Sequence, residues 1–126
     1  LVGSEMCIRD RYKRVDIGLS PFPYGGGATS VEGLWMGVPV ITKKGRNFLS
    51  NIGTTIAHNS NLSDWIACDN NDYVKKAIKF SSDLPSLSTL RGELRGRLSR
   101  SPLCDSAKFA CNFEKAVWEI WNSKDN

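Results

Sequence analysis

The apolar and polar positions divide the chain into a first part with short apolar runs and a second part with helical periodicity. Apolar runs at 15–19 and 38–42 predict two strands, and prolines stop the first of them. Between the runs lie a glycine-rich turn and a short segment that ends at Gly37, which is typical of a helix C-terminus. Strand, turn, helix and strand in this order predict one parallel βαβ unit over 16–42.

The second part of the chain is mainly helical by the same criterion. Apolar residues recur at intervals of three and four, and an apolar run at 62–67 predicts one more short strand. The predicted helices are 48–58, 73–81, 84–98 and 105–121. Two or three strands followed by four helices indicate the α/β class, and part of a Rossmann-like layer rather than a closed domain.

Several side chains outside the glycine-rich turn have a structural interpretation. Trp118 and Trp121 on the last helix are expected to pack against the domain, and four arginines between 91 and 100 to form a solvated helix face. Asp16 lies in a predicted buried strand, so its carboxylate is expected to have a partner.

Three consecutive glycines, Gly25 to Gly27, precede the first predicted helix, whose N-cap is expected at Thr29 or Ser30. Their spacing matches neither a P-loop nor a dinucleotide fingerprint, so a flexible entry to a helix is one interpretation. The loop 21–28 is longer than most βα connections, however, and long loops at strand carboxyl ends line ligand crevices. Unpaired amides at a helix N-terminus favour a phosphate at this place.

Glu32 has two competing interpretations. With Thr29 it forms T-x-x-E, the pattern of a capping box in which the glutamate accepts a hydrogen bond from the cap residue's amide. Alternatively, its carboxylate accepts hydrogen bonds from the ribose hydroxyls of a nucleotide whose diphosphate lies on the neighbouring amides. The predicted nucleotide contacts are Gly26, Gly27, Ala28, Thr29 and Glu32.

Composition and charge narrow the classes of function. The formal charge of +4 comes from basic residues interleaved with acidic ones, so no nucleic-acid partner is expected. No apolar run approaches the ~20 residues that span a bilayer, and no secretory signal is recognisable, so we expect a cytoplasmic protein without a membrane partner. The four cysteines form no C-x-x-C pair and there is one histidine, so we expect no metal cofactor.

The first ten residues, LVGSEMCIRD, are the translation of a transposase adapter used to prepare sequencing libraries. We therefore expect 1–10 to be an adapter artefact and exclude them from fold reasoning, as one would a tag. Residues 11–126 are then the natural part, and we expect them to have been preceded by further protein.

The natural part resembles a known family. The segments VDIGLSPFPYGGGATSVEGLWMGVPVIT, FLSNIGTTI, LRGELRGRL and SPLCDSAKFACNFEKAVWEIW are similar to the C-terminal end of the O-linked N-acetylglucosamine transferase family, especially its bacterial-type members. The resemblance covers Arg11 to Trp121. It implies a two-lobe GT-B glycosyltransferase, usually preceded by tetratricopeptide repeats, that transfers GlcNAc from UDP-GlcNAc to Ser or Thr hydroxyls of proteins. Residues 11–126 would be the end of its donor-binding lobe.

Carried over position by position, the family's diphosphate segment falls on Gly27, Ala28 and Thr29, and its ribose-binding acid on Glu32. Gly27 stands where animal members have His, and Ala28 where many have Thr, so only backbone contacts survive at these positions. Asn51 replaces an Arg common in this segment, which puts a charge role there in doubt.

The resemblance also implies what the chain lacks. The family's catalytic His and a Lys near the start of the donor lobe lie upstream, so no catalytic residue is expected here and the chain alone should be inactive. Its expected partners are a UDP-sugar donor and a protein acceptor. A transferase that uses another UDP-sugar, or a non-catalytic nucleotide-binding or interaction module, remain the alternatives.

Overall fold

The computed structural model describes residues 10–123 and contains one small parallel sheet. Its strands lie in the order β1-β2-β3, with Gly18 paired to Val40 and Thr42 to Ile66. They are β1 (Gly18–Leu19), β2 (Val40–Lys43) and β3 (Ile66–Ala67). The predicted parallel βαβ unit is therefore confirmed. Residues 1–9 of the predicted adapter segment lie outside the described residues, and its origin stays a prediction.

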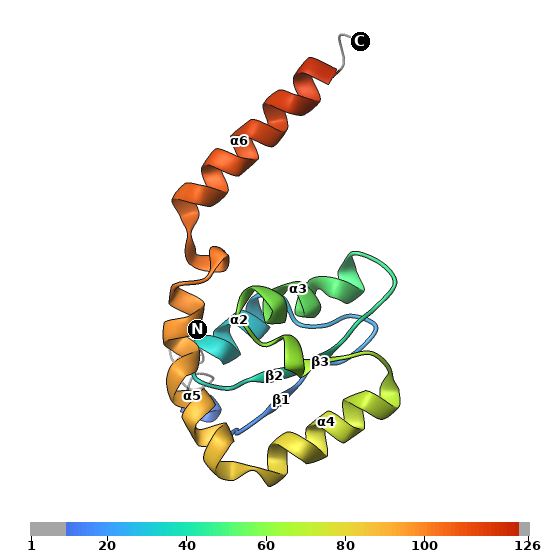
Figure 1. Ribbon diagram of the computed structural model, residues 1–126, viewed down its shortest axis with the longest axis vertical. Coiled ribbons are helices and arrows are strands. Elements are labelled where there is room, and N and C mark those ends of the chain that lie inside the picture. The colour runs from blue at the N-terminus through green and yellow to red at the C-terminus, as the bar shows by residue number, and fades with distance from the viewer. Residues whose placement is uncertain (1–9, 124–126) are drawn as a thin grey trace.

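Helices cover both faces of this sheet. In Figure 1, α2 and α3 lie on one face, α4 lies on the other, and α5 runs along the end of the sheet where it contacts both α2 and α4. The helices are α2 (Ala28–Trp35), α3 (Ile52–Asn59), α4 (Asn70–Ser82), α5 (Leu84–Ser99) and α6 (Ser106–Asn122), with short 3-10 turns η1 (Leu49–Asn51), η2 (Ser63–Trp65) and η3 (Pro102–Cys104). The α/β class is confirmed.

The core forms where these layers meet. Its buried residues come from the central strand β2, from the inner faces of α2, α3 and α5, and from the segment at η2 that precedes β3. They are Leu34, Ile41, Ile56, Ala57, Leu62, Trp65, Leu87, Leu94 and Leu98. The leucines of α5 recur at helical spacing, which is why the periodicity of 84–98 predicts this helix well.

Two strand predictions were too long. Residues 15–17 are not in a strand, and 63–65 form the 3-10 turn η2 before a two-residue β3. Asp16 is therefore exposed rather than buried, although its carboxylate does have a partner, the Arg91 guanidinium on α5. A second arginine of the predicted solvated face, Arg97, pairs with Glu93 at 2.8 Å.

The last helix stands away from the rest of the molecule. Figure 1 shows α6 pointing away from the sheet and its covering helices. Asp105 caps it by accepting a hydrogen bond from the Lys108 amide at 2.9 Å. Trp118 and Trp121 are 59% and 65% exposed, so the prediction that they pack against the domain is wrong for the part of the chain described.

Candidate functional site

The glycine-rich loop lies at the carboxyl end of β1, where it leads into α2. The Ser20 amide donates to the Ile41 carbonyl at 2.9 Å, which extends the strand pairing up to the loop. At Gly26, a Cβ would lie 2.6 Å from Thr29 Oγ1 and 2.7 Å from Ser30 Oγ. A larger residue there would push these two hydroxyls away, because the loop passes directly over the first turn of α2.

The N-terminus of α2 begins earlier than the sequence predicts. Gly27 is its N-cap and no side chain caps it, so the prediction of Thr29 or Ser30 as the N-cap is wrong. Ser30 is buried instead, and its hydroxyl donates to the Gly26 carbonyl at 2.9 Å. Because Thr29 lies inside the helix, the T-x-x-E capping box is not formed, and Glu32 has no structural role of that kind.

At this helix end, three successive amides have no acceptor among the described residues. The first hydrogen bonds of α2 run from Ser30 and Val31 to the Gly27 carbonyl, and within residues 10–123 we find no acceptor for the amides of Gly27, Ala28 and Thr29. These amides and the positive end of the helix dipole together form an anion-binding arrangement. The first turn also carries no acidic residue that would compensate it.

Glu32 lies on α2, about one helical turn after these amides. It lies four residues after Ala28, and residues at that spacing share a helix face. Its side chain is exposed, and its carboxylate has no hydrogen bond or ion pair within the described residues. It lines an open hollow of about 380 Å³ with Trp35 and Arg95. Gly26 and Thr29 line a different hollow, so the structure does not enclose Glu32 and the glycine-rich loop in one pocket.

Tyr73 supports the loop from the other side of the sheet, which the sequence did not reveal. Its hydroxyl donates to the Ser20 carbonyl at 2.9 Å, and its ring meets the Phe22 ring edge-on at 5.5 Å. Burial raises the pKa of the Tyr73 phenol, so the hydroxyl keeps its proton and remains a donor. The contact spans 53 residues of sequence, and no local pattern signals it.

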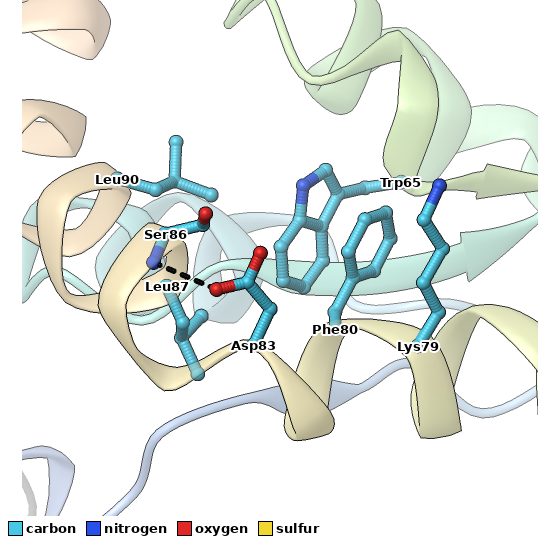
Figure 2. A pocket seen from close by; sticks show the side chains of 7 residues that line it. All are labelled: Trp65, Lys79, Phe80, Asp83, Ser86, Leu87 and Leu90. Atoms are coloured by element: carbon cyan, nitrogen blue, oxygen red, sulfur yellow. Dashed lines mark hydrogen bonds between the residues drawn. The ribbon is translucent and has the colours of Figure 1, made fainter.

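A second, mostly apolar pocket lies at the α4–α5 junction. Figure 2 shows Trp65 and Phe80 stacked on one side of Asp83 and Leu87 on the other, with Asp83 accepting a hydrogen bond from the Ser86 amide. Trp65 precedes β3 and Asp83 follows α4, so the pocket lies at the amino ends of the strands. It is therefore separate from the glycine-rich loop, which lies at their carboxyl ends.

In the described part of the chain, no three side chains of His, Cys, Asp or Glu gather as a metal site would require. None of the helices described is long and apolar enough to cross a membrane.

The parallel strands and their covering helices define part of a Rossmann-like α/β lobe. Residues 4–113 match glycosyl transferase family 41, and the chain belongs to that family. Together with the structural likeness below, this confirms the resemblance to O-GlcNAc transferases.

The relatives are plant and bacterial transferases. A tomato (Solanum lycopersicum) protein, named as probable UDP-N-acetylglucosamine--peptide N-acetylglucosaminyltransferase SPINDLY, is 42% identical over 110 residues. That match covers 87% of this chain and 12% of the tomato protein. The corresponding SEC protein of Arabidopsis thaliana is 26% identical over 98 residues, which are 77% of this chain and 10% of SEC.

A solved structure shares the fold. A mutant O-GlcNAc transferase from Thermobaculum terrenum superposes with a TM-score of 0.84 at 29% identity, covering 92% of this chain and 22% of the bacterial one. The chain therefore corresponds to a region of a glycosyltransferase, and it spans about one eighth of the tomato relative's length.

Proposed function

We propose that this chain supplies the nucleoside-diphosphate cradle of a cytoplasmic protein O-GlcNAc transferase. In this proposal the amides of Gly27, Ala28 and Thr29 bind the diphosphate of UDP-GlcNAc, Gly26 lets the loop approach it, and Glu32 binds the ribose hydroxyls. The acceptors are Ser and Thr hydroxyls of proteins. The observation that carries the proposal is that, among the described residues, three amides at the α2 N-terminus have no acceptor and the Glu32 carboxylate on the next turn has no partner, in a chain of family 41.

The structure supports Glu32 as a ligand-binding residue by removing its competing role. A capping glutamate would be occupied by the Thr29 amide, whereas Gly27 is the N-cap here and the Glu32 carboxylate has no partner within the described residues. The names of the tomato and Arabidopsis relatives, and of the bacterial structure, support GlcNAc transfer to protein.

In the proposed reaction the free amides act on the leaving group. When the glycosidic bond to the β-phosphate breaks, negative charge develops on the diphosphate. Fixed N–H dipoles already aimed at that position stabilise the charge without reorganising. This role needs neither a side chain at Gly27 nor a metal ion. The acid–base step is assigned to polypeptide outside these 126 residues, so the chain alone should bind nucleotide but not transfer sugar.

The proposal is tested by titrating the isotope-labelled 126-residue chain with UDP and recording its amide NMR spectrum. UDP should shift the amide signals of residues 26–32, and UMP, which lacks the β-phosphate, should bind more weakly. Glu32→Ala should weaken UDP binding by about 10- to 100-fold, because hydrogen bonds to a charged group contribute ~1.5–3 kcal/mol. A parallel titration with GDP determines which base the donor carries.

The matched control is Glu114→Ala, which removes an exposed glutamate from α6. It should leave UDP binding unchanged. Equal affinity of the native chain and Glu32→Ala for UDP would remove Glu32 from the site. A lower melting temperature of Glu32→Ala with unchanged binding would instead restore the capping interpretation.

A further inference from the structure

A basic hollow opens at the same edge of the sheet as the glycine-rich loop. It measures about 360 Å³ and lies at the carboxyl ends of β1 and β2. Pro21, Phe22, Pro23 and Gly25 line it from the glycine-rich loop, and the segment 42–47 lines it from β2. A ligand held on the α2 N-terminus would therefore have this hollow as its neighbour, because one loop borders both.

The charge of this hollow is uniformly positive. Lys43, Lys44 and Arg46 line it, and no acidic residue among 10–123 does. None of the three lies within 4 Å of a carboxylate in the described part of the chain. Lys43 is held in place, since its ammonium donates to Asn70 Oδ1 at 2.8 Å and lies 3.8 Å from the centre of the Phe22 ring.

The backbone that carries these cations is firmly held. The Asn51 side chain accepts from the Gly45 amide at 3.0 Å and donates to the Gly45 and Asn47 carbonyls at 3.0 and 2.8 Å. Asn47 and Ser50 exchange three further hydrogen bonds. A Cβ at Gly45 would lie 2.0 Å from Ser50 Oγ, so the turn admits only glycine. Lys44 and Arg46 are thus presented from a fixed turn, which lowers the entropic cost of binding.

We propose that this basic hollow binds an acidic side chain of the acceptor polypeptide, next to the hydroxyl that receives the sugar. The inference rests on the proposed function, which places the donor diphosphate on the adjoining α2 N-terminus. Lys44 and Arg46 pair with the carboxylate, and Phe22 with the two prolines contacts the apolar part of the peptide. The hollow therefore selects Ser or Thr sites flanked by Asp or Glu.

The lining favours a peptide over a second phosphate group. The free amides at 27–29 already account for the diphosphate, and they lie outside the lining of this hollow. Proline rings and an aromatic ring beside lysine and arginine match a peptide, which offers both apolar and charged groups. Inorganic phosphate would use only the charges.

The test compares two short peptides on the isotope-labelled 126-residue chain. One is acetyl-Asp-Asp-Ser-Asp-Asp-amide, and the other has Asn in place of each Asp. The acidic peptide should shift the amide signals of residues 43–47, and added NaCl should weaken its binding because salt screens surface charge. Lys44→Glu with Arg46→Glu should weaken it by about tenfold or more, since like charges then face each other. Both side chains are exposed, so the fold should survive.

The matched control is Lys75→Glu with Lys108→Glu, which changes the net charge equally at exposed positions on α4 and α6. It should leave peptide binding nearly unchanged. An equal loss in this control, or equal binding of the neutral peptide, would overturn the proposal. So would inorganic pyrophosphate shifting 43–47 more strongly than the peptide does, since the hollow would then be a phosphate site.

UDP binding is read at different residues, 26–32, so the two proposals fail separately. If UDP binds and the peptide does not, the proposed diphosphate site stands and the proposed acceptor site is wrong. If the peptide binds and UDP does not, the proposed diphosphate site is wrong, and the peptide can no longer be assigned as an acceptor.

Discussion

The α/β body, residues 18–101, and the helix α6 have similar apolar patterning but different surroundings. In the body, Leu94 and Leu98 of α5 are each 1% exposed, because α5 packs against α2 and α4. In α6, Phe113 and Trp121 lie at helical spacing too, yet they are 61% and 65% exposed. Periodicity therefore predicts which face of a helix is apolar. It does not predict whether another element of the fold packs against that face.

The largest expected effect distinguishes the two regions directly. Leu94→Ala should lower the free energy of unfolding by about 2–5 kcal/mol, because it leaves a cavity in the closed core. Phe113→Ala removes a larger side chain but should change it by no more than about 0.5 kcal/mol, since that ring is already in water. Urea unfolding of the two variants checks this. Similar losses in both would show that α6 belongs to the same cooperative unit.

A pair of glycine variants sharpens the view of the body. Gly53→Ala places a Cβ 2.4 Å from Thr42 Oγ1, in the contact between α3 and β2, and should cost about 1–3 kcal/mol through overpacking. Gly92→Ala on α5 is the control, because a Cβ there meets no atom within 4 Å. It should stabilise the chain by about 0.4–1 kcal/mol, since alanine restricts the unfolded chain. Thermal unfolding of the two variants should therefore shift in opposite directions.

What the sequence predicts well is local. The helices α4, α5 and α6 follow from periodicity. The structure adds their N-caps, since Asp69, Asp83 and Asp105 each accept a hydrogen bond from the amide three residues on. Strand length was overestimated at 15–17, because a strand exists only where a neighbour pairs with it, and only Gly18 and Leu19 pair with β2.

The candidate site likewise has some features that the sequence predicts and others that it does not. A glycine loop before a helix indicates free amides, and the structure places them at Gly27 to Thr29. The T-x-x-E pattern could not decide the role of Glu32, because the choice of N-cap depends on the path of the loop over α2. From the sequence, Asn51 is only a departure from an arginine, whereas in the structure its side-chain hydrogen bonds hold the basic turn 43–47. These contacts depend on loop geometry, which no periodicity encodes.

The two aspartate caps provide a smaller test of the comparison. Asp83 caps α5, which is part of the α/β body, and Asp105 caps α6, which is not. Asp83→Ala should lower the melting temperature of the body, by less than Gly53→Ala does, and Asp105→Ala should leave it unchanged. Circular dichroism melts of both variants check this. Equal shifts would show that the two helices are equally coupled to the body.

The fall of the melting temperature at acid pH is a second measure of the Asp83 cap. Hydrogen bonds from Ser86 hold the pKa of Asp83 below its ordinary value. Its contribution is therefore complete above the pKa of the unfolded carboxyl, about 3.9, and is lost as the pH falls through the lower folded value. Asp83→Asn should remove this part of the acid dependence, seen as a shallower fall of the melting temperature below about pH 4. An unchanged acid limb would show that the charge of Asp83 contributes nothing there.

Changes to the exposed apolar face of α6 should have the smallest effect on stability and the largest effect on self-association of the chain. Replacing Phe113 and Trp121 by serine should leave the unfolding free energy within about 0.5 kcal/mol, because both rings are exposed. The same change removes much of the apolar face of α6, and large exposed apolar patches promote association. Sedimentation velocity at rising concentration should therefore show self-association of the native chain and much less of it in the double variant. If both chains sediment as monomers, the apolar face of α6 does not bind a second copy of the chain. The difference between α5 and α6 would then be one of packing geometry alone.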